Sequence, residues 1–317
     1  MLHRLHRLSL AFVCVLWAAG CEGHFDDQGE TVEGWCPSQA LELLRPRADS
    51  TEAYVGGWVV STLECAPAWA EIELSTPAGA PIEGELSNHH DGAQYRFRSS
   101  DFLEPLTTYD VRLRTSRRFN NWSFSTSALG IPTSEALPGR TLSVKPRTGL
   151  LLEPPGLAEI LDELLLPFAP VLEFTHPPAN GSVPIRMGGR LAGSVQDPSQ
   201  RVLDLPASWD DPFWSFGPFD LAWILEEGQI KLDQATFSGA VHSTIDGAGG
   251  GISIWGTWDP RPAESELGVT LQDLCDLSLD KGGQGCVPCS DGVETCLPFA
   301  LVHIEADLWS GSLDPNL

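Results

Sequence analysis

Apolar and polar residues alternate at every second position in several segments, and this pattern limits how the chain can fold more than any other feature. In the first half, the alternating apolar residues are Ala70, Ile72, Leu74, Tyr95, Phe97, Tyr109, Val111, Leu113, Trp122 and Phe124. Successive side chains of a strand point to opposite faces of a sheet, so the pattern predicts strands with one buried and one solvated face. We expect antiparallel sheets here, with a turn at Asn120-Asn121 between the last two strands.

Residues 140–317 should form a second β domain. The expected strands are Thr141–Val144, Val171–Phe174, Val183–Arg190, Val202–Leu205, Phe213–Leu225 with a break at Gly217-Pro218, Ile230–His242, Ile252–Trp258 and Phe299–Leu308. One face of the last strand is expected to carry Ala300, Val302, Ile304, Ala306 and Leu308. Successive strands with few helices are typical of an antiparallel barrel or a strongly curved sheet.

Two short helices are expected among these strands, at Pro155–Leu166 and Glu264–Leu277. The first carries an apolar stripe made of Leu157, Ile160, Leu161, Leu164 and Leu165. This spacing places the five side chains on one helix face. A leucine stripe left in water would be an exposed patch that monomeric proteins avoid. We therefore expect it to pack across the mouth or the interior of the β domain.

The end of the first region carries a family resemblance. Residues 106–113, Leu-Thr-Thr-Tyr-Asp-Val-Arg-Leu, and residues 122–126, Trp-Ser-Phe-Ser-Thr, resemble the closing two strands of bacterial Ig-like domains. The resemblance implies an Ig-like β-sandwich over residues 35–127, with Tyr109 at a tyrosine corner. Cys36 and Cys65 would then tie the first strand region to the second or to its exit. The chain is thus expected to be mainly β, with an Ig-like sandwich, then a barrel-like or curved-sheet domain with one or two short helices.

The first 20 residues have the order of a secretory signal. Arg4 and Arg7 precede the short apolar run Leu8–Trp17, and Ala18-Ala19-Gly20 then stands directly before Cys21. The apolar run is too short to span a bilayer. The site resembles the bacterial lipobox, although Ala18 stands where that motif usually has Leu. The resemblance implies lipid on Cys21; the alternative is an ordinary signal peptide followed by a coincidental cysteine.

The segment after the signal should be a tether. Residues 21–34 are polar and have almost nothing to pack, which predicts a flexible connection to the lipid. In Gram-negative lipoproteins an Asp directly after the cysteine favours the inner membrane. Here that residue is Glu22, so the resemblance favours the outer membrane of the cell envelope.

Charge excludes one class of partner. The chain has 19 basic and 43 acidic residues and a net charge of −24, and losing Arg4 and Arg7 with the signal makes it still more acidic. Such a chain repels the phosphates of nucleic acids. We therefore expect no nucleic-acid partner.

Six cysteines remain after the signal and the lipidation site. They are Cys36, Cys65, Cys275, Cys286, Cys289 and Cys296. An even number in two clusters suits disulfides formed outside the cytoplasm. The late four, with Cys286-x-x-Cys289, also resemble a four-thiolate zinc site. Export favours disulfides, and the pairing among the late four stays open.

The late cysteines carry a second resemblance. Residues 286–297, together with Cys275 and Gln196-Asp197-Pro198, resemble uncharacterised lipoproteins of large-genome Gram-negative bacteria. In those proteins an Ig-like domain precedes a Cys-rich C-terminal β domain. This family brings no known activity with it.

Signatures of catalysis, cofactors and metals are absent from the sequence. It has no G-x-S-x-G, H-E-x-x-H, G-x-x-x-x-G-K or G-x-G-x-x-G motif. The glycine cluster Gly247–Gly251 is expected in a hairpin loop, and His89-His90-Asp91 in an exposed loop. His176, His242 and His303 are isolated in the sequence. We expect no enzyme, no cofactor and no metal site.

An aromatic cluster is the candidate ligand site. It comprises Trp209, Phe213, Trp214, Phe219 and Trp223, with carboxylates between them. Such residues can stack on sugars or line an apolar pocket, but they can equally fill the domain core. The predicted function is a non-catalytic envelope lipoprotein, anchored to the membrane through Cys21, that acts as a surface interaction or scaffold module. The alternative is a carrier of a hydrophobic ligand or lipid in the C-terminal domain. Its partner would be an envelope protein, a glycan or a lipid.

Overall fold

The computed structural model describes residues 41–56, 58–63, 66–89, 93–133, 137–225, 228–244 and 247–316. The expected signal, Cys21, the tether, Cys36, Cys65 and the His90-Asp91 pair lie outside the described residues. Residues Ser38–Leu317 form one compact unit. Among the residues that the structure describes, no helix has both the length and the apolar character needed to cross a bilayer.

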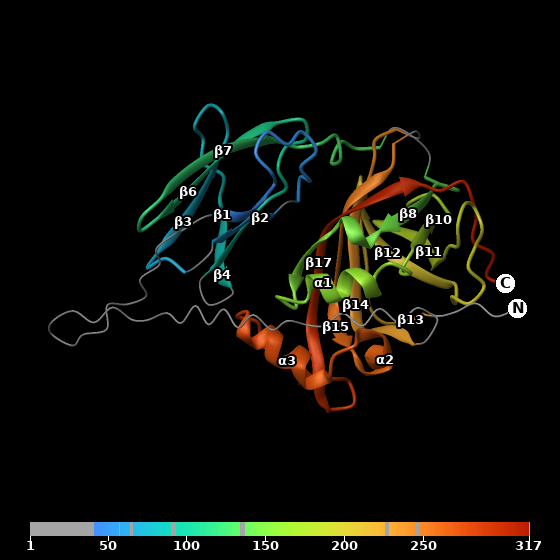
Figure 1. Cartoon of the computed structure of the whole chain (residues 1–317). Coiled ribbons are helices and arrows are strands. Elements are labelled where there is room, and N and C mark those ends of the chain that lie inside the picture. Colours follow the sequence, from blue (N-terminus) through green and yellow to red (C-terminus); the bar gives the residue numbers. More distant parts are fainter. Residues whose placement is uncertain are drawn as a thin grey trace, which may run out of the picture. The chain divides into compact units, whose positions relative to one another are not determined.

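The first module is an Ig-like β-sandwich, as expected (Figure 1). One sheet has the order β1 (Leu41–Arg45), β2 (Trp58–Leu63), β5 (Gln94–Ser99) and β4 (Gly84–His89); the other has the order β3 (Ala70–Ser75), β6 (Thr108–Thr115) and β7 (Phe119–Ser125). With the strands lettered in chain order, these are the ABED and CFG sheets of a constant-type Ig domain. The alternating apolar side chains of both sheets meet in one buried cluster.

Of two features expected at the β6–β7 hairpin, the structure shows one. The tyrosine corner is confirmed, because the backbone N–H of Glu104 donates a 2.8 Å hydrogen bond to the hydroxyl of Tyr109. The predicted turn at Asn120-Asn121 is wrong, since both residues lie in β7 and pair with β6. The turn is formed at residues 116–118 instead. There the hydroxyl of Thr115 accepts hydrogen bonds from two following N–H groups and so closes the turn locally.

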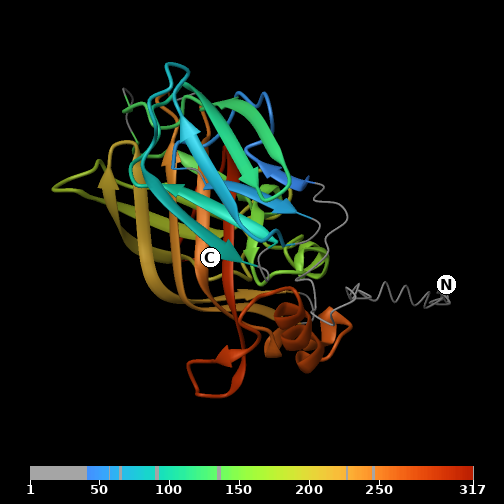
Figure 2. The ribbon, with the colours of Figure 1, turned by 90° about the vertical axis from the view of Figure 1, so that its left-hand side faces the viewer.

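The second module is a closed antiparallel barrel. Eight of the described strands follow one another around it in sequence order: β8 (Thr141–Lys145), β10 (Pro170–Phe174), β11 (Ser182–Gly189), β12 (Leu203–Asp210), β13 (Phe213–Ile224), β14 (Gln229–Val241), β15 (Gly249–Asp259) and β17 (Glu294–Leu308). Strand β17 closes the barrel by pairing with both β15 and β8. Figure 2 shows the long orange strands β14 and β15 beside the red strand β17. Short strands β9 (Leu150–Glu153) and β16 (Val287–Pro288) also pair with β17.

Apolar side chains from all eight strands fill the barrel interior. They form one buried cluster that includes the stacked rings of Trp214, Phe216 and Phe237, with centroids 5.5 and 5.2 Å apart. Helix α1 (Ala158–Leu164) lies between β9 and β10 in the chain, and Leu161 and Leu164 on it are buried in the same cluster. The predicted packing of the leucine stripe is therefore confirmed. The helix is shorter than expected.

The last strand does not keep one face along its length. Leu301 packs inside the barrel and Val302 outside, but Ile304 and Ala306 are inside again. The reason is a bulge at His303, whose φ of 59° is in the left-handed region and shifts the pairing with β15. One extra residue in a strand moves all later side chains to the opposite face. The expectation of a single face from Ala300 to Leu308 is therefore wrong.

Two other expected boundaries change. The predicted helix Glu264–Leu277 is split into α2 (Glu264–Leu267) and α3 (Leu271–Asp280). Gly268, at φ 67°, ends the first helix, and Thr270 and Asp273 form a capping box that begins the second. The chain does not break at Gly217-Pro218, because β13 continues through it with shifts of register.

The late cysteines form disulfides, as expected, and not a four-thiolate zinc site. Cys275 of α3 is bonded to Cys286, and Cys289 is bonded to Cys296 of β17. Together the two bonds fasten α3 and the loop after it to the closing strand. Pairing within this cluster could not be derived from the sequence.

Candidate functional site

The sandwich contacts the barrel through a buried polar cluster. Arg96 of β5 donates a 2.7 Å hydrogen bond from Nη2 to the carbonyl of Leu152, and its Nη1 lies 3.2 Å from Oε1 of Glu153. Val60 of β2 packs with Leu152 and Val302 in a small apolar cluster beside it. His89, expected in a loop, ends strand β4 and lies 3.9 Å from Glu153. The two modules are thus packed directly on each other.

The glycine cluster is a second contact with the sandwich. Gly251 has a φ of 57°, and a β-carbon there would overlap the ring of Tyr54. A β-carbon on Gly250 would lie 2.7 Å from Leu129. The prediction of a hairpin loop holds only for the start of the cluster, because residues 249–251 belong to β15. These glycines lack side chains where the sandwich approaches the barrel backbone.

A groove of about 580 Å³ lies on the outer face of the barrel beside the sandwich. Its floor contains serines that pair across neighbouring strands, namely Ser208, Ser215, Ser238 and Ser253. Paired residues of antiparallel strands point to the same face. The four strands β12 to β15 therefore present a continuous row of hydroxyl groups. Ser208 and Ser215 are linked by a 2.6 Å hydrogen bond between their Oγ atoms.

Aromatic side chains from both modules border this row. Phe102 of the sandwich stacks on Phe213 of the barrel, with ring centroids 4.1 Å apart and planes 2° from parallel. Phe102 is still 56% exposed. Trp255 also lines the groove, and Asp210 and Arg98 lie at it. A row of hydroxyls between exposed rings can bind a ligand that has both hydrogen-bonding groups and flat apolar faces.

The structure brings only part of the predicted aromatic cluster to this groove. Phe213 presents its ring to the groove, stacked on Phe102. Trp209 and Trp214 pair with each other on the opposite face of the sheet from the serines and pack with the barrel interior. Phe219 and Trp223 also pack with the interior, where Trp223 meets Phe168 edge-on at 4.9 Å. The serine row was not predicted, although the register of the strands, once known, aligns these serines.

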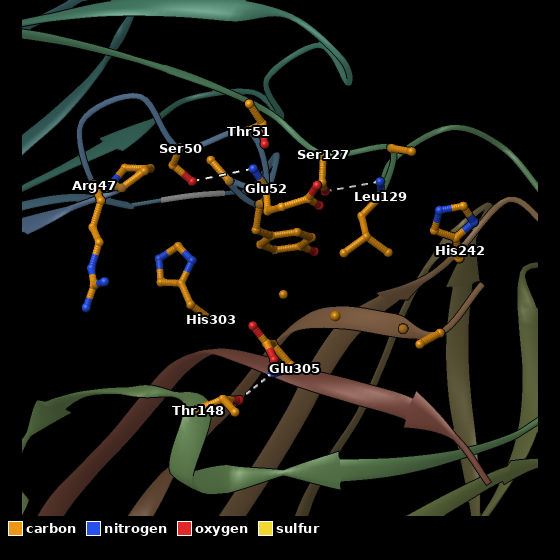
Figure 3. Close-up of a pocket in the computed structure, with 18 of the residues that line it drawn as sticks. Arg47, Ser50, Thr51, Glu52, Ser127, Leu129, Thr148, His242, His303 and Glu305 are labelled. Atoms are coloured by element: carbon orange, nitrogen blue, oxygen red, sulfur yellow. Dashed lines mark hydrogen bonds between the residues drawn. The ribbon is translucent and has the colours of Figure 1, made fainter.

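A larger cavity of about 890 Å³ lies between the sandwich loops and the glycine-rich end of β15. In Figure 3, Arg47 reaches into it from the sandwich side, and His303 rises from β17 on the barrel side. His242 and Glu305 line the same cavity. His242 and His303 are isolated in the sequence and lie in or directly after strands, but the fold brings both to one cavity. No short sequence spacing could have shown this.

A third cluster contains charged groups beside a disulfide. Asp259 accepts two 2.8 Å hydrogen bonds from Arg261 and one of 3.0 Å from Lys231. Burial favours a raised pKa for Asp259, but these hydrogen bonds outweigh it and lower the pKa to about 2. Within the described ranges, the only group with the spacing of a metal site is Asp259 with Cys289 and Cys296. Both sulfurs are bonded to each other, so they offer no thiolate to a metal.

Comparisons with known proteins assign no family. No protein-family model matches the chain, and no curated protein matches it. Similar solved structures include the S-layer protein rSbsC, at 12% identity and a TM-score of 0.23 over 67% of this chain and 32% of that chain. They also include domains from titin, at 10% identity and a TM-score of 0.20 over 69% of this chain and 93% of that chain. A third is Dpr2 in complex with DIP-Theta, at 9% identity and a TM-score of 0.21 over 84% and 90% of the two chains. At such TM-scores these likenesses carry no argument about function, and the fold assignment rests on the strand pairing described above.

Proposed function

We propose that the chain is a non-catalytic lipoprotein of the cell envelope that binds an extracytoplasmic glycan in the groove between its sandwich and its barrel. The observation that carries this proposal is the row of four serines bordered by Phe102, Phe213 and Trp255. Saccharides have apolar ring faces that stack on aromatic side chains, and their hydroxyl groups pair with protein hydroxyls. The groove offers both kinds of contact on a supporting sheet.

The packing of the two modules supports an interaction role for the pair. Phe102 comes from the sandwich and Phe213 from the barrel, so the groove needs both. The sandwich would then be part of the binding surface and not only a spacer. Binding sites on strands are held more firmly than sites on free loops.

The alternative, a carrier of a hydrophobic ligand, has less support. A carrier barrel of this size holds its ligand in the interior. Here the inward side chains, including Trp214, Phe216 and Phe237, pack against one another in a continuous cluster. Native mass spectrometry of the purified protein distinguishes the two functions, because a carrier would retain lipid inside the barrel and a surface module would not.

Membrane attachment is proposed from the sequence around Cys21. The small residues before it favour lipid attachment, and Glu22 stands where an Asp would favour the inner membrane, which favours the outer membrane. Expression in a Gram-negative host with labelled palmitate should label the protein. The Cys21→Ser variant should lose both the label and membrane association. Equal membrane association of the variant would contradict the anchor.

A matched pair of phenylalanines tests the groove. Phe102 is 56% exposed and Phe119, on the β6–β7 hairpin of the sandwich, is 58% exposed. On an array of envelope saccharides, the wild-type chain should bind one class of glycan. Phe102→Ala should weaken that binding roughly tenfold, because one stacking ring contributes about 1 kcal/mol or more. Phe119→Ala should leave it unchanged.

The serine row is tested by blocking it. Ser238→Val fills the floor with a side chain that suits a strand, and Ser123→Val makes the same change on β7 of the sandwich. We expect loss of glycan binding only in Ser238→Val. Absence of glycan binding by the wild-type chain, or equal losses in both variants, would refute the proposal.

A further inference from the structure

Two arginines stand at the large cavity. Arg45 and Arg47 both line it. Arg45 donates a 3.0 Å hydrogen bond to the carbonyl of Leu44, and among the described residues no carboxylate lies within ion-pair distance of either guanidinium. Burial and the nearby charge of Arg47 lower the pKa of Arg45. In a chain with 43 acidic and 19 basic residues, two neighbouring cations with no carboxylate partner in the described part of the chain are an unusual arrangement.

His303 adds an unsatisfied imidazole to the same cavity. Its side chain keeps some exposed surface, but Nε2 is buried and has no hydrogen-bond partner among the described residues. Burial, with a smaller contribution from Arg45, lowers the pKa of His303 to about 4. The ring is therefore neutral at pH 7. A buried polar atom without a partner costs free energy.

The backbone at His303 supports a built site. A histidine with a φ of 59° in a strand is strained, by about 1 kcal/mol or more. The bulge interrupts the alternation of inward and outward side chains along β17, so that the side chain of His303 points toward the sandwich (Figure 3). Bulges are common beside functional sites because they redirect a side chain.

We propose that Arg45, Arg47 and His303 form a site for an anionic group, either a phosphate or a carboxylate carried by a small ligand. Guanidinium groups bind both kinds of oxyanion through paired N–H donors, and an imidazole N–H supplies a further donor. The cavity, of about 890 Å³, is large enough for a ligand that carries the anion on a larger body. This site is separate from the glycan groove and does not depend on it.

The cavity also has acidic residues, which makes its anion binding dependent on pH. Asp49, Glu52 and Tyr54 face it from the sandwich, His242 lies at it directly after β14, and Glu305 and Asp307 face it from β17. Asp307 is paired with Lys145. A bound anion should raise the pKa of His303, because it stabilises the imidazolium. Protons would then be taken up on binding, so affinity should increase as the pH falls from 7 toward 4.

The mature chain is titrated with three probes at low and constant ionic strength: inorganic phosphate, inorganic sulfate and acetate. Calorimetry gives the affinity, and the ring resonances of His303 in NMR give its pKa. We expect at least one probe to bind and to raise the pKa of His303. Phosphate and sulfate binding without acetate binding would indicate a phosphate-type ligand, and the reverse would indicate a carboxylate. Sulfate is used for the pH series because its charge does not change in that range.

Three variants and one control test the assignment. Arg45→Gln, Arg47→Gln and His303→Gln should each weaken binding roughly tenfold or more, as expected for loss of a charge-assisted hydrogen bond. Arg118→Gln changes the net charge by the same amount at the turn of the β6–β7 hairpin and should have no effect. His303→Gln should also flatten the pH dependence of sulfate binding, which protonation of the four carboxylates alone would not do. The proposal is overturned if no probe binds and the pKa of His303 stays constant, or if Arg118→Gln weakens binding as much as the cavity variants.

Discussion

Arg96 of the sandwich and Glu153 of the barrel form an ion pair between the two modules, with Nη1 of the arginine 3.2 Å from Oε1 of the glutamate. The arginine side chain is 4% exposed and the glutamate 20%. Burial raises the pKa of Glu153 more than Arg96 lowers it. The pair therefore joins the two modules. Removing its charges from water costs free energy, which is offset only by the attraction between the two side chains and by their hydrogen bonds.

Removing one partner should expose that cost. Arg96→Met leaves Glu153 buried without a counter-charge, so we expect a loss of about 3–5 kcal/mol in the free energy of unfolding at pH 7. The loss should shrink toward pH 4, because a carboxyl with a raised pKa becomes neutral on acidification and neutral Glu153 needs no cation. Urea unfolding at both pH values measures this. The double variant Arg96→Met with Glu153→Gln should recover most of the stability, and no recovery would contradict the explanation.

Asp259 should make the barrel sensitive to acid. Its pKa of about 2 in the folded chain is below the value for an unfolded aspartate. A depressed pKa contributes stability above the unfolded value, and that contribution is lost as the pH falls from about 4 toward 2. Asp259→Asn should therefore cost roughly 2 kcal/mol at pH 7 and much less at pH 2. Asp291→Asn, at an exposed partner of the same Arg261, is the control and should change stability little.

The disulfides can be tested by counting free thiols. The mature chain, denatured without reductant, should have no free thiol from the four late cysteines. A total of zero free thiols would also support the predicted Cys36–Cys65 pair, and a total of two would show that this pair is open. Replacing Cys289 and Cys296 together by Ser should lower the free energy of unfolding by about 2–3 kcal/mol, as for other short loops. Four free thiols with one bound zinc would contradict the disulfides.

Helix α1 should contribute to the stability of the barrel core. Leu161 is 2% exposed in the barrel cluster, whereas Leu166, just after the helix, is 64% exposed. Leu161→Asp should cost about 3–5 kcal/mol, because it opens a cavity and buries a charge. Leu166→Asp should leave the melting temperature nearly unchanged. Thermal unfolding of the two variants compares them directly, and equal melting temperatures would mean that α1 is not part of the core.

The strands could be predicted because their signal is local. Alternation such as Tyr109, Val111 and Leu113 against polar neighbours depends only on strand geometry, so it gave both the sandwich and the barrel class. The Ig-like sandwich and the tyrosine corner were expected from a resemblance, and the structure shows both. Signals of this kind require no knowledge of which residues meet.

The cavity and the groove could not be predicted, because each depends on register. His303 leaves the alternation through a bulge whose left-handed residue is fixed by pairing with β15, and nothing at His303 itself encodes it. His242 reaches the same cavity only because β14 and β17 both border β15. Likewise, the serine row exists only once four strands are aligned. Trp223 has the same local pattern as Phe213, yet it lies inside because of bulges along β13.

Closure of the barrel by β17 also constrains the order in which the chain can fold. The partners β8 and β17 stand at opposite ends of the barrel sequence, so their pairing closes a very long loop. Until β17 arrives, β8 and β15 each present an unpaired edge, and such edges template association between chains. A protein threaded across a membrane from its N-terminal end would deliver this strand after all its barrel partners. Folding by such a route would therefore pass through an interval in which the barrel is an open sheet, exposed to other chains and to chaperones that bind strand edges.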